Sequence, residues 1–145
     1  MDDRFELERF RSAQAGAYDR ALRELRSGRK RGHWIWFVFP QLRGLGRSEM
    51  SHRYGIASLA EARAYLADQT LGPRLRECCE ALLVLDEDAD IGTVMGGIDA
   101  LKLRSSMTLF ALADPSEALF DRVLQRWYDG ERDDATVRLL DTADR

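Results

Sequence analysis

The stretch RKRGHWIWFVFPQ, residues 29–41, decides the fold class of this chain. Its six consecutive apolar residues, 34–39, end at Pro40, a pattern typical of either a buried strand or a buried helical segment. No second convincing strand pattern follows, and a single strand would have no partner. We therefore expect residues 34–39 to form a short helical or irregular segment that is pressed into a helical core.

The residues before this stretch carry a helical signal. Apolar side chains recur at steps of three and four over residues 7–25, which predicts an amphipathic helix. Asp2 or Asp3 can cap the start of this helix. Gly16 can bend or interrupt it, and Gly28 is suited to end it.

The residues after this stretch alternate between loops and helices. Residues 42–55 contain three glycines and several polar groups, which predicts a loop. Ser58 and Glu61 match a capping box at a helix start. Apolar residues spaced by four and three over 71–85 give the strongest helical signal in the chain. The acidic run at 86–90 predicts a solvated turn.

The last third of the chain predicts four more helical segments. A single turn at 91–95 ends at two glycines, and Asp99 is suited to cap the helix that follows. The segment 114–130 predicts a helix that starts at Asp-Pro-Ser and ends at a glycine. Asp133 or Asp134 opens the last helix. The predicted fold is all-α, an orthogonal array of about six to eight helices with a buried aromatic segment.

The composition is that of an ordinary globular domain. Of the 145 residues, 45% are apolar and 32% are charged, which supplies enough apolar surface for one core. The net charge is −3 and the pI about 5.5, and this acidic balance argues against nucleic acid as the partner. We expect a single domain over residues 1–145. The sequence leaves the oligomeric state open.

The sequence lacks the signals of secreted and membrane proteins. No apolar run approaches the roughly 20 residues of a membrane-spanning helix. Residues 1–10 lack the apolar core of a secretory signal. Cys78 and Cys79 are adjacent and give no disulfide framework. These observations predict a cytoplasmic protein with no membrane partner.

Metal and cofactor chemistry has little support in the sequence. His33 and His52 are too far from each other and from the two cysteines to form a metal-ligand motif. We therefore expect no metal site and no cofactor. Cys78 lies on the apolar stripe of its helix, whereas Cys79 lies off it and is a weak candidate for a nucleophile.

The first candidate site lies within residues 29–54. This segment contains six basic residues and only one acidic residue, Glu49. We therefore expect a positive local potential, which suits a phosphate or carboxylate. Glycines and aromatic rings add close backbone approach and stacking surfaces for a planar ligand. The candidate substrate-binding residues are Trp34, Trp36, Gln41, Arg43, Arg47, Ser48 and Tyr54. Alternatively, the aromatic run is simply core and the arginines only keep the surface soluble.

The second candidate site lies within residues 96–110. On a helix, Asp99, Lys102 and Ser106 share one face, close to a glycine-rich helix start that can receive an anion. Lys102 and Asp99 are the candidate catalytic residues, with Lys102 as a base or as a nucleophile toward an aldehyde or sugar carbon. Arg104 and Ser105 are candidates for substrate binding. Alternatively, Asp99 caps the helix, Lys102 is a solvated lysine, and the serines pack against another helix.

Several of these segments resemble a known family. They are FELERFRSAQAGAYDRALRELRSGRKRGHWIWFVFPQLRGLGRS, YGIASLAEARAYL, LGPRLREC and DALKLRSSMTLF. Together they closely resemble the family classed as domain of unknown function 1810, over about residues 4–140. Some members carry the label calpastatin, but calpain inhibitors of that kind are long disordered chains. The resemblance implies an all-α fold and no settled activity.

A weaker resemblance concerns the ADP-ribose-linked N-glycosidase superfamily. An aromatic segment, then Glu61 and Ala62 in an EA-x-x-x-L pattern, then a D-x-x-K…M segment follow one another in a similar order. The resemblance implies a site that acts on N-glycosidic bonds of ribosylated compounds, with Asp99, Lys102 and Met107 at the matching positions. The sequence departs from that superfamily because it lacks the Glu-His pair in an E-H-Y-F-Q context.

Three functional hypotheses remain after this comparison. The first is a small-molecule-binding domain, possibly enzymatic, for an ADP-ribose-like or other ribosyl-phosphate ligand. The second is a non-catalytic module that docks a protein or nucleic acid through the basic segment 29–53. The third is a small hydrolase that uses Ser105 or Ser106. A pocket that contains Lys102 would favour the first hypothesis, and a broad basic face would favour the second.

Overall fold

The computed structural model describes residues 3–143, which form ten helices. In chain order they are α1 (Glu8–Ala15), α2 (Tyr18–Arg26), α3 (Ile35–Val38), α4 (Glu49–Arg53), α5 (Leu59–Ala67), α6 (Leu71–Leu83), α7 (Ile91–Met95), α8 (Gly97–Ala113), α9 (Leu119–Tyr128) and α10 (Asp134–Ala143). The described residues contain no strand beyond one isolated bridge between Leu42 and Ile56. The predicted all-α class is confirmed. Helices outnumber the expected six to eight because the helix expected over residues 7–25 divides into α1 and α2, and because residues 42–55, expected as a loop, contain the short helix α4.

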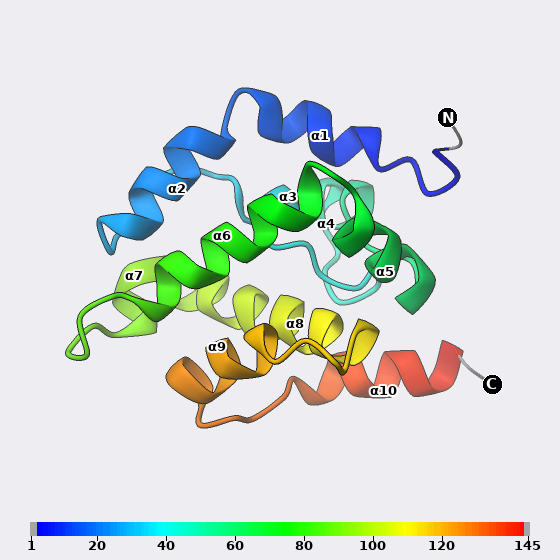
Figure 1. Ribbon diagram of the computed structural model, residues 1–145. Helices are drawn as coiled ribbons and strands as arrows, with labels where there is room; N and C mark the ends of the chain where they lie inside the picture. The colour runs from blue at the N-terminus through cyan, green and yellow to red at the C-terminus, as the bar shows by residue number, and fades with distance from the viewer. Residues whose placement is uncertain (1–2, 144–145) are drawn as a thin grey trace.

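Helix α8 is the centre of the fold. It packs against α3, α5, α7, α9 and α10, and every residue from 105 to 111 is buried. In Figure 1, α1 and α2 run along one side of the molecule and α9 and α10 along the other, with α6 and α8 between them. A row of aromatic side chains in edge-to-face and tilted contact crosses this interior. It consists of Phe10, Tyr65, Phe110 and Phe120, with neighbouring ring centroids 5.1–5.7 Å apart.

The aromatic stretch behaves as predicted. Its centre is the single-turn helix α3, and Trp34, Phe37 and Phe39 are buried in the core. Trp36 is the exception and remains partly exposed. No partner strand is needed, because the amides of Val38 and Phe39 donate to the carbonyls of Trp34 and Ile35, and the side chain of Gln14 donates to the carbonyl of Phe37.

The helical signal at residues 7–25 divides into two helices. α1 ends at Ala15, Gly16 is its C-cap, and α2 starts at Tyr18, so the predicted interruption at Gly16 is confirmed. The Asp3 carboxylate accepts hydrogen bonds from the amides of Leu7 and Glu8 at 2.9 and 3.0 Å and thereby satisfies the start of α1. Asp2, the other proposed cap, lies outside the described residues.

Three local predictions were wrong. Residues 42–55 are not all loop, because Ser48 caps the short helix α4 through the amide of Ser51. Asp99 is not an N-cap. Gly96 occupies that position with φ +88°, and Asp99 lies inside the first turn of α8. Residues 114–116 form a turn, and α9 starts only at Leu119.

Other local signals were correct. The Ser58 hydroxyl accepts the Glu61 amide at 3.1 Å, as a capping box requires. The Glu61 carboxylate in turn accepts a hydrogen bond from the amide of Ala57, whereas a standard capping box would use the amide of Ser58. Asp133 caps α10 through the amide of Thr136 at 3.1 Å. Within residues 3–143, no helix combines the length and the apolar character that crossing a bilayer would require.

Candidate functional site

A buried carboxylate shapes the loop that leads from α2 into the aromatic segment. Oε1 of Glu24 accepts hydrogen bonds from the amides of Arg31 and Gly32 and from the indole N–H of Trp34, at 2.8–2.9 Å. Oε2 accepts Nε of Arg20 at 3.0 Å. Burial by itself would raise the pKa of the Glu24 carboxyl, but these hydrogen bonds outweigh it and lower the pKa from 4.5 to about 2. Glu24 therefore fixes the path of the loop.

This loop delivers Lys30 to the first turn of α8. The amide of Lys30 is bonded to the carbonyl of Val94 at 2.7 Å, which anchors the backbone. Its ammonium Nζ lies 2.7 Å from Oδ2 of Asp99, donates to the carbonyl of Gly32, and sits 4.9 Å from the centroid of the Trp34 ring. The Lys30 side chain is only 6% exposed. Lys30 is thus a buried cation that is paired with Asp99 and bonded to the carbonyl of Gly32.

Lys102 approaches the same carboxylate from one turn along α8. Its Nζ is 3.8 Å from Oδ1 of Asp99, which is an ion pair without a hydrogen bond. The same ammonium lies 4.8 Å from the centroid of the Trp36 ring, a cation–π contact. No hydrogen bond from Nζ of Lys102 to the described residues is present, and its side chain is 22% exposed. Lys102 therefore keeps its donors for solvent or a ligand.

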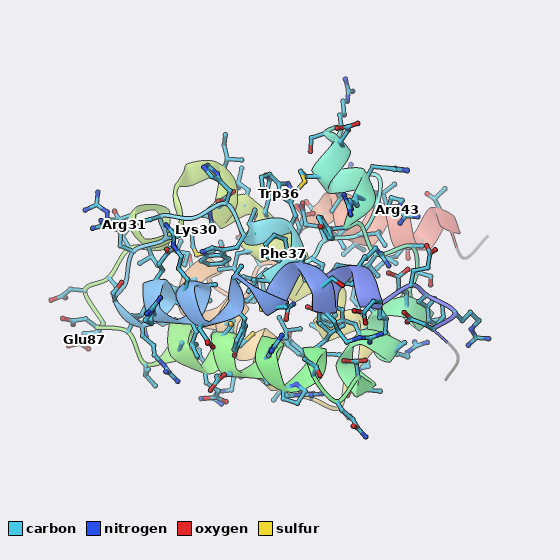
Figure 2. All side chains as sticks on the ribbon, turned by 90° about the horizontal axis from the view of Figure 1, so that it is seen from above. Lys30, Arg31, Trp36, Phe37, Arg43 and Glu87 are labelled. Atoms are coloured by element: carbon cyan, nitrogen blue, oxygen red, sulfur yellow. The ribbon has the colours of Figure 1, made fainter. Side chains whose placement is uncertain are left out.

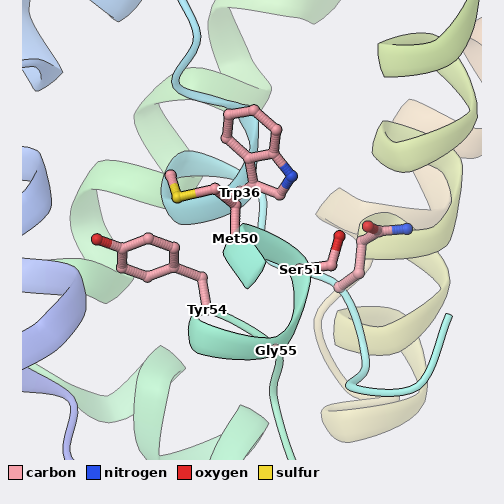
Figure 3. A pocket seen from close by; sticks show the side chains of 6 residues that line it. Trp36, Met50, Ser51, Tyr54 and Gly55 are labelled. Atoms are coloured by element: carbon pink, nitrogen blue, oxygen red, sulfur yellow. The ribbon is translucent and has the colours of Figure 1, made fainter. Parts of the chain in front are cut away.

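Trp36 borders a small cavity on the side of α4 (Figure 3). The cavity has a volume of about 10 Å³, enough for one water-sized group. Its lining consists of Trp36, Gln41, Met50, Ser51, Tyr54 and Gly55. The indole N–H of Trp36 is buried and has no acceptor among the described residues. The hydroxyl of Ser106 is in the same condition, one helical turn beyond Lys102 on α8. The two buried polar groups without partners thus belong to neighbours of Lys102: the Trp36 ring contacts its ammonium, and Ser106 lies one turn along α8.

A wider hollow opens on the outer side of α4. Its volume is about 550 Å³, and it is lined by Gly46, Arg47, Ser48, Glu49, Met50, His52 and Arg53. Met50 borders both this hollow and the small cavity. Arg9 anchors the end of α4. Its guanidinium donates to the carbonyls of Arg53 and Gly55 at 2.8 and 3.0 Å and pairs with Glu61 at 2.7 Å.

Basic side chains lie on both sides of Trp36 and Phe37. In Figure 2, Trp36 and Phe37 lie between Lys30 and Arg31 at one end and Arg43 at the other. The exposed basic residues of the segment are Arg29, Arg31, His33, Arg43, Arg47, His52 and Arg53.

Residues 4–140 match the family described as "Protein of unknown function (DUF1810)". This match covers nearly the whole chain. The chain belongs to the DUF1810 family. The resemblance noted from the sequence segments is thereby confirmed, whereas nothing in the comparisons supports the more distant link to N-glycosidases.

A solved structure agrees with this DUF1810 fold. The crystal structure of the conserved hypothetical protein Rv1873 from Mycobacterium tuberculosis is 52% identical, with a TM-score of 0.94. The alignment covers 96% of the present chain and 99% of that chain. No curated protein matches this sequence.

The DUF1810 chain brings two groups of predicted residues together. Trp36, Asp99 and Lys102 meet where α3 contacts α8, so the segments 29–55 and 99–106 do adjoin. Gln41 and Tyr54 join Trp36 around the small cavity, and Arg47 and Ser48 line the hollow. Tyr54 is largely buried, and its ring packs against those of Phe37 and Phe10.

Other predicted residues lie apart from this group. Trp34 is 2% exposed and bonded to Glu24, which is a structural position. Arg43 is exposed, and its Nε is bonded to the carbonyl of His52 at 3.2 Å. Arg104 projects toward α10, where it holds the carbonyls of residues 131 and 132. The hydroxyl of Ser105 is bonded back to the carbonyl of residue 101.

The residues that assemble the site were not among the candidates predicted from the sequence. Glu24 reads as an ordinary helix-surface acid, and Arg9 as an ordinary helix-surface base. Lys30 appeared only as one member of a basic run. One available signal was overlooked: among 22 Lys and Arg residues, only Lys30 and Lys102 are lysines. Both lie at Asp99.

Proposed function

We propose that this DUF1810 protein binds a small anionic ligand with a planar group where the segment 29–55 meets α8. The observation that carries the proposal is the position of Lys102. Its ammonium is held over Trp36 at 4.8 Å and has no hydrogen-bond acceptor among the described residues. An ammonium beside an aromatic face suits a phosphate or carboxylate attached to a ring.

The ligand class that fits this chemistry best is a nucleotide-like or ribosyl-phosphate compound. Lys102 would hold the phosphate, the partly exposed face of Trp36 would stack on the planar group, and Arg47 would extend the anion site toward the hollow at α4. Gln41 would supply a polar contact beside the unpaired indole N–H. Supporting this class, the exposed basic residues around Trp36 give the face a positive potential.

An enzymatic role at the same place would concern the N-glycosidic bond of such a ligand. Cleavage of that bond develops positive charge on the ribosyl carbon, and a nearby carboxylate stabilises it. Asp99 is the carboxylate closest to Lys102, at 3.8 Å. Asp99 and Lys102 are therefore the residues that we propose for any chemistry.

A thermal-shift panel tests the proposal. The purified protein is heated with ADP-ribose, NAD, ribose 5-phosphate, AMP or inorganic phosphate. A ligand at about a hundred times its Kd stabilises the fold by about 2.7 kcal/mol, which is several degrees for a domain of this size. Lys102→Ala should abolish the shift. Arg122→Ala, an exposed cation on α9, is the matched control and should retain it.

A second candidate function is a docking module for an acidic partner. The exposed arginines of the segment 29–53 and the open hollow at α4 favour it. This function predicts binding that weakens steeply with salt and that depends on several arginines together. No shift with any small anion, combined with salt-sensitive capture of an acidic polypeptide, would favour docking over the small-molecule site.

The serine-hydrolase hypothesis receives no support from the geometry. Ser106 is fully buried, and Ser105 is 6% exposed with its hydroxyl engaged on its own helix. Neither side chain is accessible as a nucleophile.

A further inference from the structure

The two lysines of the chain share one carboxylate. Twenty of the 22 Lys and Arg side chains are arginines, yet both cations at Asp99 are lysines. A lysine ammonium is a compact point charge, whereas a guanidinium is a broad planar fork. Each of these compact charges also lies near an indole ring, Lys30 at Trp34 and Lys102 at Trp36.

The two lysines are not equivalent toward Asp99. Lys30 forms a short, charge-assisted contact of 2.7 Å with Oδ2, and its side chain is almost fully buried. Lys102 stays 3.8 Å from Oδ1. Residues at i and i+3 on a helix commonly form close ion pairs, so the helix itself does not keep Lys102 away from Asp99. The two lysines lie at different oxygens of the carboxylate, and the contact of Lys30 is the closer one.

From this geometry we infer that Lys30 is a positioning residue for the anion site of the proposed function. Lys30 holds Asp99 and thereby prevents Asp99 from neutralising Lys102. Two ammonium groups and one carboxylate leave one positive charge in the cluster, and the exposed member, Lys102, carries it toward the ligand. The inference rests on the proposed function, although Lys30 itself touches no ligand.

The inference predicts a definite response when Lys30 is removed. In Lys30→Met, Asp99 turns to Lys102 and closes the 3.8 Å gap, so the cluster becomes neutral. Binding of an anion should then weaken roughly tenfold, because the net charge of the cluster falls from one positive charge to zero. The backbone of the loop should keep its path, since the bonds of Glu24 and the bond between the Lys30 amide and Val94 do not use the lysine side chain.

The decisive experiment is a rescue. Binding of ADP-ribose and of inorganic phosphate is titrated for the wild type, Lys30→Met, Asp99→Asn and the double variant. The double variant should bind nearly as well as the wild type, because it lacks the carboxylate that would neutralise Lys102. Asp99→Asn alone should bind the anion more tightly than the wild type, because no carboxylate then offsets the two lysines, whereas any chemistry that uses Asp99 should be lost. Weak binding by the double variant, or wild-type binding by Lys30→Met, would overturn the inference.

A second readout does not need a ligand. Lys102 is the sole lysine of Lys30→Met, so its acetylation by an N-hydroxysuccinimide ester can be followed by peptide mass spectrometry. Acetylation of Lys102 should slow in Lys30→Met and recover in the double variant. Unchanged rates would overturn the inference even if the anion binds. Conversely, the expected rates without any anion binding would leave the charge arrangement intact and reject only the proposed function.

If Lys30→Met fails to fold, anion binding by Asp99→Asn still tests the inference. The loss of anion binding in Asp99→Asn, to the level of Lys102→Met, would show that Asp99 is part of the binding contacts and not a competitor for Lys102.

Discussion

Oε1 of Glu24 accepts a hydrogen bond from Nε1 of Trp34 at 2.9 Å, and this contact ties α2 to the aromatic stretch that decides the fold. The same oxygen also accepts the amides of Arg31 and Gly32, so one carboxylate organises the turn between the two segments. The stability of this turn, and with it the position of Lys30, depends on the charge of Glu24.

We expect Glu24→Gln to lower the free energy of unfolding at pH 7 by about 1–3 kcal/mol, because charge-assisted hydrogen bonds are replaced by neutral ones. The pKa of Glu24 is lowered from 4.5 to about 2 on folding, so its contribution is present above pH 4.5 and is lost as the pH falls toward 2. Urea melts at pH 7 and at pH 2.5 should show a wild-type advantage that shrinks in acid.

Glu87→Gln is the matched control for this experiment. Glu87 is exposed in the acidic turn that follows α6 (Figure 2), so its replacement should leave the urea midpoint unchanged. A Glu24→Gln variant as stable as this control at pH 7 would contradict the assigned role of Glu24.

The ion pair of Arg9 and Glu61 should support the segment beside α4. Their side chains are 14% and 4% exposed, and Glu61→Gln leaves the Arg9 guanidinium without its carboxylate. Removing one partner of a buried pair costs about 3 kcal/mol. Hydrogen exchange should also accelerate at residues 53–57, which the pair holds. Glu8→Gln, in the exposed pair with Arg11, should change neither measurement.

Two adjacent glycines should respond to alanine in opposite directions. Gly96 has φ +88°, a conformation that costs a non-glycine residue about 1–2 kcal/mol, so Gly96→Ala should destabilise the fold. Gly97 is in the first turn of α8, and a Cβ there would meet open space. Gly97→Ala should therefore stabilise the fold by about 0.4–1 kcal/mol. Thermal melts of the two variants that shift in the same direction would contradict the assigned helix start.

Both cysteines should be inert while the protein is folded. Cys78 and Cys79 are fully buried, and burial raises the pKa of the Cys78 thiol to about 12 and that of Cys79 well above its ordinary value. The reactive thiolate is thus scarce as well as inaccessible. An aromatic disulfide reagent should react only in urea, at the rate of global unfolding. Rapid reaction of one thiol in buffer would restore Cys79 as a nucleophile candidate.

The sequence by itself determined the elements that depend on neighbours a few residues away. Apolar spacing of three and four located the longer helices, and the Ser58 cap is a bond between residues three apart in the chain. The missing partner strand predicted the helical state of the aromatic stretch. Local basic and aromatic density also located the face that contains Trp36. The short helix α4 was missed because its five residues span little more than one period.

Only the tertiary structure decided which of these residues meet. Lys30 and Asp99 belong to distant parts of the chain, and their 2.7 Å contact exists because α8 packs against α3 and Glu24 shapes the loop. Asp99 is not the cap that its local sequence suggests because α8 starts at Gly97, with Gly96 at the N-cap position. The pairing of distant charges is set by how the apolar core packs and by burial, which weakens solvent screening and strengthens each ion pair. Neither the packing of the core nor the burial of a charge is encoded in the spacing of residues along one helix.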